Sequence, residues 1–256
     1  MTEVDGMELQ GELGQRLSDA EQAAVDYINK QRCIINLLSI EDVATGAFVS
    51  NATVSRAIRK CGFSSFSEMK FRLSEEQKTN RQSSEMNRIL SKSYRECVET
   101  VKRIDIPSVI AAARMIREAR TVYLLANGLT ALIAEEFALQ LQCQHIAVCL
   151  ISDSEMMKKL DLLSTERDLI LILSVKNSTP ELAIGARLGK KQGASVVSCC
   201  CMQGTALDEV SDLCIYGYTQ SIYPNRFFGG TSRLGLQIIT RTLIEYLVSE
   251  DETAEN

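Results

Sequence analysis

The chain has 256 residues, of which 45% are hydrophobic and 24% are charged, and its 28 basic residues against 33 acidic ones give a net charge of −5. This length allows two modest domains, and the composition is that of a soluble globular protein. No apolar run approaches the ~20 residues of a membrane span, and the acidic N-terminus lacks the segments of a secretion signal, so we expect a cytoplasmic protein with no membrane partner.

The N-terminal part of the chain predicts a small all-helical domain. Residues 1–16 are mostly polar, are acidic and lack periodicity, so we expect a loose tail. Ser18 and Glu21 then have the spacing of a capping box and begin a helix. Two further capped helices follow, one after Ser39 and one after Ser50, with a short turn between them. Two helices across a tight turn form a helix-turn-helix, whose second helix enters the major groove of DNA.

The helix that follows Ser50 has one apolar and one basic face. Val54, Ile58 and Cys61 recur at helical spacing and should pack inward. Residues 50–73 hold five basic residues against one glutamate in an otherwise acidic chain, which favours a polyanion partner over a merely solvated helix face. We expect this helix to contact DNA through Ser50, Asn51, Thr53, Ser55, Arg56, Arg59 and Lys60.

A polar stretch separates this domain from the rest of the chain. Before it, a capping box from Ser65 to Glu68 opens a helix whose Lys70 and Arg72 are further candidates for phosphate contact. Residues 74–91 then turn polar, and apolar residues recur at spacings of three and four from Met86 to Ile104, which predicts an amphipathic helix. We therefore place a helix-turn-helix domain at 1–77, a helical linker at 78–104 and a second domain at 105–256.

The second domain alternates apolar strands with helices. Its strand candidates are continuous apolar runs, as in a parallel sheet whose two faces are both covered. We predict a five-stranded αβα sandwich with strands at 121–126, 146–151, 169–173, 195–200 and 213–216, and helices led by 131–141, 155–162, 181–192 and 230–248.

The cysteines and the single histidine favour structural roles. The nine cysteines are scattered without a Cys-x-x-Cys pair, and a disulfide framework is not expected in a chain of this length that lacks a secretion signal. Cys199, Cys200 and Cys201 are successive residues of a strand and point to alternating faces, so they cannot converge on one ion and are expected to be buried. We expect no metal and no cofactor, and a structural His145.

Two turns of the second domain have the chemistry of an anion site. In such a sheet, ligands bind beyond the carboxyl ends of the strands, where helix N-termini attract anions. One turn runs from Asn127 to Thr130 and the other from Ser174 to Thr179, and both combine small or hydroxyl side chains with a following helix. The predicted ligand-binding residues are Asn127, Gly128, Thr130, Ser174, Lys176, Asn177, Ser178 and Thr179.

Both parts of the chain resemble one bacterial family. The first motif is Val49-Ser50-x-Ala52-Thr53-Val54-Ser55-Arg56 followed by Cys61-Gly62-Phe63-x-x-Phe66-x-Glu68-x-Lys70. It is similar to the helix-turn-helix domain of the RpiR transcription regulators. Residues 105–249 resemble the sugar isomerase (SIS) domain to which that helix-turn-helix is joined. The matching elements are Gly128-x-Thr130, Ala134-Glu135-Glu136, Ser174 with Thr179 and Glu181, Lys190-Lys191-x-Gly193-Ala194-x-Val196-Val197, and Arg226 with Ser232-Arg233.

The chain departs from the family pattern where glycines are usual. Phe48 stands in the turn of the helix-turn-helix, and Ala126 stands at the head of the first ligand loop. Lys176 and Asn177 replace the usual second serine and the glycine of the second loop. The amine of Lys176 would then hold phosphate in place of a hydroxyl, or the loss of both glycines would close the pocket.

The resemblance implies a transcription regulator that binds double-stranded operator DNA. It further implies that the C-terminal domain senses a phosphorylated sugar and forms a homodimer or a higher oligomer. One alternative is an aldose–ketose isomerase, for which Glu135, Glu136 and His145 are the only visible acid–base candidates. The other is a sugar-phosphate-responsive protein that has a vestigial pocket or has lost DNA contact.

Overall fold

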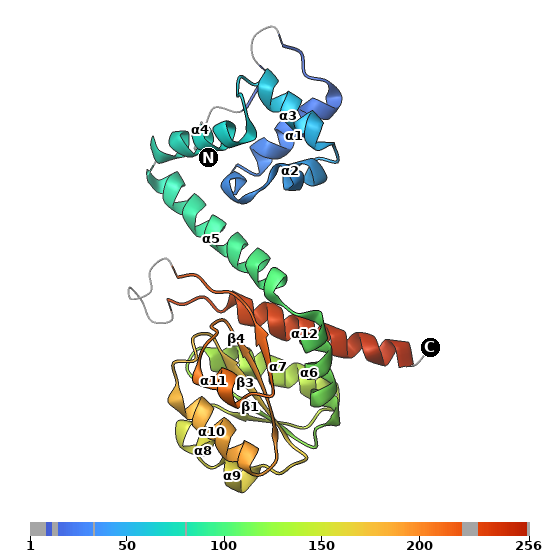
Figure 1. Cartoon of the computed structure of the whole chain (residues 1–256), viewed down its shortest axis with the longest axis vertical. Helices are drawn as coiled ribbons and strands as arrows, with labels where there is room; N and C mark the ends of the chain where they lie inside the picture. The colour runs from blue at the N-terminus through green and yellow to red at the C-terminus, as the bar shows by residue number, and fades with distance from the viewer. Residues whose placement is uncertain (1–8, 12–14, 33, 80, 222–229, 255–256) are drawn as a thin grey trace. The chain divides into compact units, whose positions relative to one another are not determined.

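The computed structural model describes residues 9–11, 15–32, 34–79, 81–221 and 230–254 (Figure 1). The chain divides into two compact units, residues 1–95 and residues 96–256, which we call the first and the second unit. None of the described helices is both long enough and apolar enough to cross a membrane.

The first unit is all-helical. Its elements are α1 (Asp19–Lys30), the short 3-10 helix η1 (Ile35–Leu37), α2 (Ile40–Gly46), α3 (Asn51–Lys60), α4 (Phe66–Thr79) and the greater part of α5 (Arg81–Arg103). The three expected caps are confirmed, because Ser18, Ser39 and Ser50 each accept a hydrogen bond from the third residue of the following helix. The capping box expected before α4 is only half formed. The carboxylate of Glu68 accepts from Ser64 rather than from Ser65.

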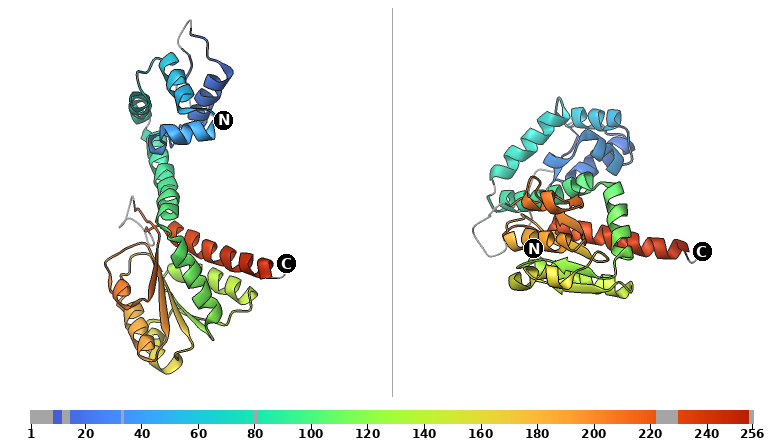
Figure 2. Two further views of the ribbon diagram at one scale, coloured as in Figure 1. Left: turned by 45° about the vertical axis from the view of Figure 1, so that its right-hand side comes forward. Right: turned by 60° about the horizontal axis from the view of Figure 1, so that its bottom comes forward.

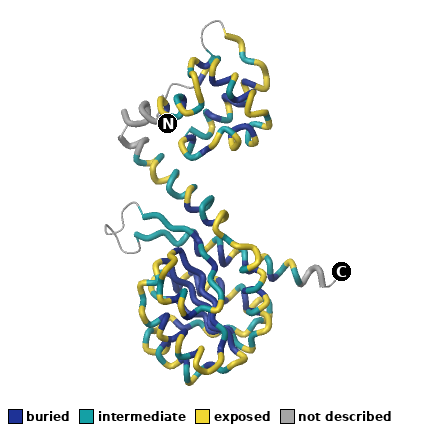
Figure 3. The backbone as a smooth tube through the Cα atoms, in the orientation of Figure 1, coloured by how far each residue is buried: buried dark blue, intermediate teal, exposed yellow. Residues whose placement is uncertain are grey.

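The core of the first unit gathers the apolar faces of these helices. Val54, Ile58 and Cys61 of the α3 region pack with Ala24 and Ile28 of α1, as the helical spacing predicted. Figure 3 shows buried and exposed stretches alternating along the helices of this unit. The prediction of a loose tail at residues 1–16 is wrong at Leu9, which is buried in this core. Most of the other tail residues lie outside the described part of the chain.

The backbone of Leu9 is also tied down. Its N–H donates to the side chain of Asn29, which in turn donates to the Leu9 carbonyl, both at 3.0 Å. A single apolar residue in a polar stretch has no periodicity, so its burial could not be predicted from the sequence pattern.

The second unit contains one parallel sheet. Its strands are β1 (Val122–Leu125), β2 (Val148–Ile151), β3 (Leu169–Ser174), β4 (Ser195–Cys200) and β5 (Leu213–Tyr216), in the order β2-β1-β3-β4-β5. The helices are α6 (Ile106–Glu118), α7 (Thr130–Cys143), α8 (Ser154–Met157), α9 (Leu160–Leu163), α10 (Pro180–Lys191), α11 (Ala206–Val210) and α12 (Leu234–Ala254). The predicted fold class and all five strands are confirmed. The single helix expected at 155–162 is instead the two short helices α8 and α9.

Helices cover both faces of this sheet (Figure 2). Alternate strand residues point to opposite faces, so Val122 and Leu124 join a core with α6, α7 and α12, while Tyr123 and Leu125 join a core with α8 to α11. Burial on both faces holds for β1, β3 and β4. It fails for β2, where Cys149 is exposed, because an edge strand has a neighbour on one side only.

The cysteine triplet is buried, as expected. Cys199 and Cys201 belong to the core that includes α12, and Cys200 is buried as well. Burial raises the pKa of Cys200 to about 11 and that of Cys201 to about 12. These thiols therefore stay neutral at pH 7 and act as small apolar side chains.

Candidate functional site

The outer face of α3 is the first candidate site. Ser50, Asn51, Arg56 and Arg59 are exposed and Ser55 is half-buried, so the fold brings these predicted residues to one surface. Thr53 is buried instead, and it acts inside the helix.

Thr53 shares a hydrogen bond of 2.9 Å with Ser50 and accepts one of 3.2 Å from the Arg56 guanidinium. Thr53 thus orients Arg56 and is placed to support the surface rather than to form it.

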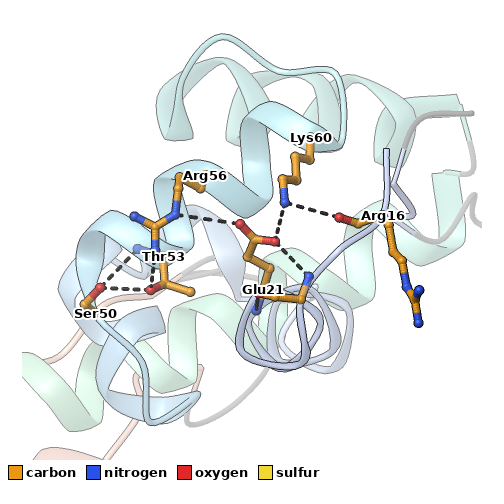
Figure 4. A network of polar contacts seen from close by, with 7 residues as sticks. Arg16, Glu21, Ser50, Thr53, Arg56 and Lys60 are labelled. Atoms are coloured by element: carbon orange, nitrogen blue, oxygen red, sulfur yellow. Dashed lines mark hydrogen bonds and ion pairs between the residues drawn. The ribbon is translucent and has the colours of Figure 1, made fainter. Parts of the chain in front are cut away.

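A carboxylate from α1 reaches the basic side of α3 (Figure 4). Glu21 is almost fully buried; its carboxylate lies 2.6 Å from the Lys60 ammonium and 3.7 Å from Nε of Arg56. Lys60 also donates to the carbonyl of Arg16 at 3.2 Å. The hydrogen bond from Lys60 lowers the pKa of Glu21 to about 2.

Two of the predicted cations are therefore used inside the first unit. Lys60 is directed toward Glu21, and Lys70 donates to the carbonyl of Leu38 at 2.9 Å. Lys70 also lies over the ring of Phe66, and burial lowers its pKa. Arg59 remains as an exposed cation of α3. The number of lysines and arginines in residues 50–73 is therefore larger than the number of cations that this region presents to a partner.

The turn between α2 and α3 holds a strained residue. Phe48, which stands where the family usually has glycine, has φ of +57° and a 95% exposed side chain. A bulky residue pays a steric cost in the left-handed region, and this ring gains no burial in return. The turn therefore keeps the glycine-like backbone even though the glycine is missing.

A pocket in the second unit is the other candidate site. Its volume is about 160 Å³, and it opens where the loops after β1 and β3 diverge. This is the topological switch point of the sheet, because the chain continues from β1 to β2 on one side and reaches β3 on the other. Its lining consists of Asn127, Thr130, Leu173, Ser174, Val175, Lys176, Ser178, Thr179, Leu182, Thr231 and Arg233.

Six of the eight predicted ligand residues line this pocket, and their donors are well placed for an anion. Thr179 occupies the N-cap position of α10, yet its side chain makes no capping hydrogen bond, so its hydroxyl can bind a ligand. The N-termini of α7 and α10 both lie at the pocket and add partial positive charge. The lining residues that the structure describes include no carboxylate and no imidazole.

Arg233 is the charged residue among the five lining residues that our site prediction missed; the others are Leu173, Val175, Leu182 and Thr231. Its Nε donates to the Thr130 hydroxyl at 3.3 Å, and its Nη1 donates to the carbonyl of Thr231 at 2.9 Å. Burial lowers its pKa, but a guanidinium stays charged at neutral pH. The sequence contained one signal of its role. A cation directly before a helix N-terminus is unfavourable because of the helix dipole, so an arginine at this position indicates a role other than helix stabilisation. Arg226, matched through the same segment, lies outside the described residues.

Gly128 and Asn177 do not line the pocket. Asn177 has φ of +53°, the left-handed conformation that suits the glycine it replaces. Its side chain donates to the hydroxyl of Thr205 at 2.7 Å and to the carbonyl of Met202 at 3.4 Å. Asn177 therefore anchors the second ligand loop to the connection between β4 and α11. The pocket remains open although both usual glycines are absent.

The acid–base candidates lie away from the pocket. Glu135 and Glu136 are exposed on α7, and Glu136 lines a separate groove between α7 and α12. His145 is exposed and follows the C-cap of α7 with φ of +60°. None of the three belongs to the described lining of the pocket.

Comparisons with known proteins match both units. The model of the helix-turn-helix domain of the rpiR family matches residues 6–80, and that of the SIS domain matches residues 115–243. The HTH-type transcriptional regulator HexR of Pseudomonas aeruginosa is 24% identical over 211 residues, which cover 78% of this chain and 74% of HexR. An uncharacterized HTH-type transcriptional regulator of Clostridium perfringens is 22% identical over 197 residues, which cover 72% of this chain and 71% of that protein.

Solved structures agree with the fold. The Vibrio vulnificus NanR protein complexed with ManNAc-6P superposes with a TM-score of 0.59 at 20% identity, covering 93% of this chain and 92% of that one. The sugar isomerase domain of the RpiR transcription factor from Sphaerobacter thermophilus superposes with a TM-score of 0.59 at 13% identity, covering 65% of this chain and 90% of that one. At these identities the likeness concerns the fold.

Proposed function

This chain belongs to the RpiR family of helix-turn-helix transcriptional regulators and carries a SIS domain, and we propose that it binds operator DNA as a homodimer and senses a phosphorylated sugar. In this proposal α3 is the recognition helix, and the pocket between the loops after β1 and β3 is the sensor. The two activities lie in different units, as expected of a regulator whose DNA affinity responds to a metabolite.

The observation that carries the ligand proposal is the set of donors around the pocket. Lys176 and the half-buried Arg233 supply two cations, and Thr130, Ser178 and Thr179 supply hydroxyls. Charge-assisted hydrogen bonds and two helix N-termini suit a phosphate dianion. The NanR protein that this chain resembles in fold is complexed with ManNAc-6P, which supports the same class of ligand.

The size of the pocket suggests which end of the ligand it takes. Its volume of about 160 Å³ is below the roughly 300–1,000 Å³ of ordinary small-molecule sites. A phosphate group with the first atoms of a sugar fits such a space. The sugar ring would then extend past the exposed Lys176 and Ser178, where selectivity among sugars would be decided.

Sensing is favoured over turnover by the chemistry of the described lining. An aldose–ketose isomerase needs a base within hydrogen-bond reach of the carbon-bound proton. The described lining offers hydroxyls, an amide and two cations, and the three carboxylate or imidazole candidates lie elsewhere. This supports a regulator that binds a sugar phosphate without converting it.

The homodimer proposal rests on apolar side chains that the second unit leaves exposed. Leu132 and Leu139 on α7 are 59% and 64% exposed, and α7 forms a groove of about 350 Å³ with α12. Exposed apolar surface of this kind marks interfaces. In a two-fold dimer the two α3 helices would read half-sites about 34 Å apart, or a multiple of that spacing.

The test begins with a duplex selected by the whole chain from a randomised pool. DNA affinity is then measured by fluorescence anisotropy with a panel of phosphorylated hexoses, pentoses and amino sugars, N-acetylmannosamine 6-phosphate included. We expect enrichment of a two-fold symmetric sequence and a change in DNA affinity with at least one sugar phosphate, without conversion of that sugar. Isomerisation of a bound sugar, or no enriched sequence, would overturn the proposal.

A further inference from the structure

The part of α5 that belongs to the second unit buries polar side chains. Glu96 and Thr100 are both 0% exposed, although neither belongs to the apolar residues that predicted an amphipathic helix here. A spacing of four residues places the two on one face of the helix. A carboxylate is rarely buried without a structural or functional reason.

These two side chains bind the backbone that follows β5. The Glu96 carboxylate accepts from the N–H of Gln220 at 2.7 Å and lies 3.3 Å from the hydroxyl of Thr219. The Thr100 hydroxyl accepts from the N–H of Tyr218 at 3.0 Å. The guanidinium of Arg103 lies over the Tyr218 ring at 4.6 Å. Two turns of α5 are therefore attached to residues 218–220.

Residues 218–221 are in turn attached to the segment that enters the pocket. The Thr219 hydroxyl lies 2.9 Å from the carbonyl of Ser232, and the Ser221 hydroxyl donates to the carbonyl of Gly230 at 2.9 Å. The next residues of that segment, Thr231 and Arg233, line the pocket.

Gly235 makes the junction tight. A Cβ atom on Gly235 would lie 2.7 Å from the Tyr218 carbonyl oxygen and 3.1 Å from the Thr100 hydroxyl. Gly235 is the second residue of α12 and lies two residues after Arg233, so the first turn of this helix is in close contact with both α5 and residue 218. Close packing of this kind transmits displacement because it leaves no free volume to absorb it.

We propose that Glu96 and Thr100 couple ligand occupancy of the pocket to DNA affinity, an inference that rests on the proposed function. A phosphate in the pocket competes with Thr130 and Thr231 for the Arg233 guanidinium. Residues 231–233 then shift, and residues 218–220 shift with them.

Helix α5 follows that shift, because a buried carboxylate or hydroxyl that loses its partners is costly. The helix is continuous back to Arg81, and Tyr94 packs against the core of the first unit. Helix α5 is thus the output element of the sensor, and Glu96 and Thr100 are positioning residues that contact neither ligand nor DNA.

The experiment compares matched variants of the full chain. Thr100→Val removes the hydroxyl at constant shape, and Thr100→Ser keeps it. Glu96→Met removes the buried carboxylate, and Glu99→Met removes the partly exposed carboxylate that pairs with Lys102 on the same helix. For each variant the affinity for the selected duplex is measured with and without the most effective sugar phosphate of the panel, and the affinity for that sugar phosphate is measured by calorimetry.

In the unaltered chain we expect the sugar phosphate to change DNA affinity by the roughly 5–150-fold of ordinary allosteric couplings. In Thr100→Val and Glu96→Met the sugar phosphate should change DNA affinity by less than about twofold. The affinity of these variants for the sugar phosphate should stay within about threefold of that of the unaltered chain. Thr100→Ser and Glu99→Met should keep the factor. Because coupling is reciprocal, the selected duplex should change sugar-phosphate affinity by the same factor.

The outcomes separate this inference from the proposed function. If the sugar phosphates leave the DNA affinity of the unaltered chain unchanged, both fail. If the unaltered chain responds and Thr100→Val responds equally, the coupling through residues 96 and 100 is wrong and the sensor function stands. Thermal unfolding verifies that each variant folds. If Glu96→Met does not fold, the comparison of Thr100→Val with Thr100→Ser decides the question.

Discussion

In the first unit two basic side chains, one on α3 and one on α4, are engaged by other groups of the fold, whereas at the pocket the basic side chains surround a space whose described lining has no carboxylates. Lys60 is bound by Glu21 and Lys70 by the carbonyl of Leu38. Arg233 contacts a hydroxyl and a carbonyl, and the described lining of the pocket holds no acidic group. A cation with a carboxylate partner stabilises the fold or orients a neighbour. A cation that lines a pocket can form a charge-assisted hydrogen bond to an anionic ligand there.

The largest expected effect tests the pocket side of this comparison. Arg233→Ala should weaken sugar-phosphate binding by about 100-fold, because it removes a half-buried charge-assisted contact. Lys176→Ala should cost about tenfold, since its exposed ammonium is screened by solvent. Calorimetry with the most effective sugar phosphate measures both. Arg187→Ala, which removes an exposed arginine of α10 near Glu209, is the control, and a larger loss for Lys176→Ala than for Arg233→Ala would contradict this ranking.

The next effect concerns the two kinds of cation on α3. Arg59→Ala should reduce affinity for the selected duplex about tenfold and lower the slope of log affinity against log salt by about one. Lys60→Ala should leave that slope unchanged and lower the thermal unfolding midpoint instead, because it removes the nearer of the two cations that contact the buried Glu21. Titrations at several salt concentrations measure the slopes. Equal slope changes for the two variants would show that Lys60 also reaches phosphate.

A smaller effect compares the two left-handed residues that replace glycines. Phe48→Gly should stabilise the chain by about 1 kcal/mol, because it relieves steric strain and sacrifices no burial. Asn177→Gly should destabilise it, because the hydrogen bonds to Thr205 and Met202 are lost. Urea unfolding measures both, and Phe48→Ala, which keeps a Cβ at the strained position, is the control. Stabilisation by Phe48→Ala equal to that of Phe48→Gly would refute the strain argument.

The smallest effect is a pH dependence in the first unit. The folded pKa of Glu21 is about 2 against an ordinary 4.5, so its contribution to stability is present above pH 4.5 and is lost as the pH falls toward 2. The unaltered chain should therefore lose more stability between pH 5 and pH 3 than Glu21→Gln does. Urea unfolding at both pH values gives the difference, and an identical loss would show that Lys60 does not hold the carboxylate in solution.

Local signals in the sequence predicted most of the fold. Ser18, Ser39 and Ser50 act through neighbours three residues away, so the helix starts could be read directly. The five strands were evident from their apolar runs. The two loops that line the pocket could be predicted to meet because a parallel sheet brings the ends of its strands to one edge.

What could not be predicted depends on residues that are distant in the chain. Arg233 meets Thr130 across about a hundred residues, and Lys60 turns inward only because α1 places Glu21 beside it. The burial of Glu96 and Thr100 depends on residues 218–220. Amphipathic periodicity shows which side of a helix is apolar, but it does not show which polar group a distant segment will bury.

The packing of α12 against α6 and α7 bears on how the protein is made. The first unit can complete its core once residue 95 has left the ribosome, whereas the core of the second unit joins its first helix to its last. At about 5–20 residues per second, synthesis of the second unit takes on the order of ten seconds. During that interval a nascent chain already displays α3 but lacks Arg233 and the wall that α12 provides. The proposed DNA-contacting helix therefore forms before the proposed sensor pocket, and a chain that stops short of α12 would keep α3 without a complete pocket and without the α7–α12 surface of the proposed dimer.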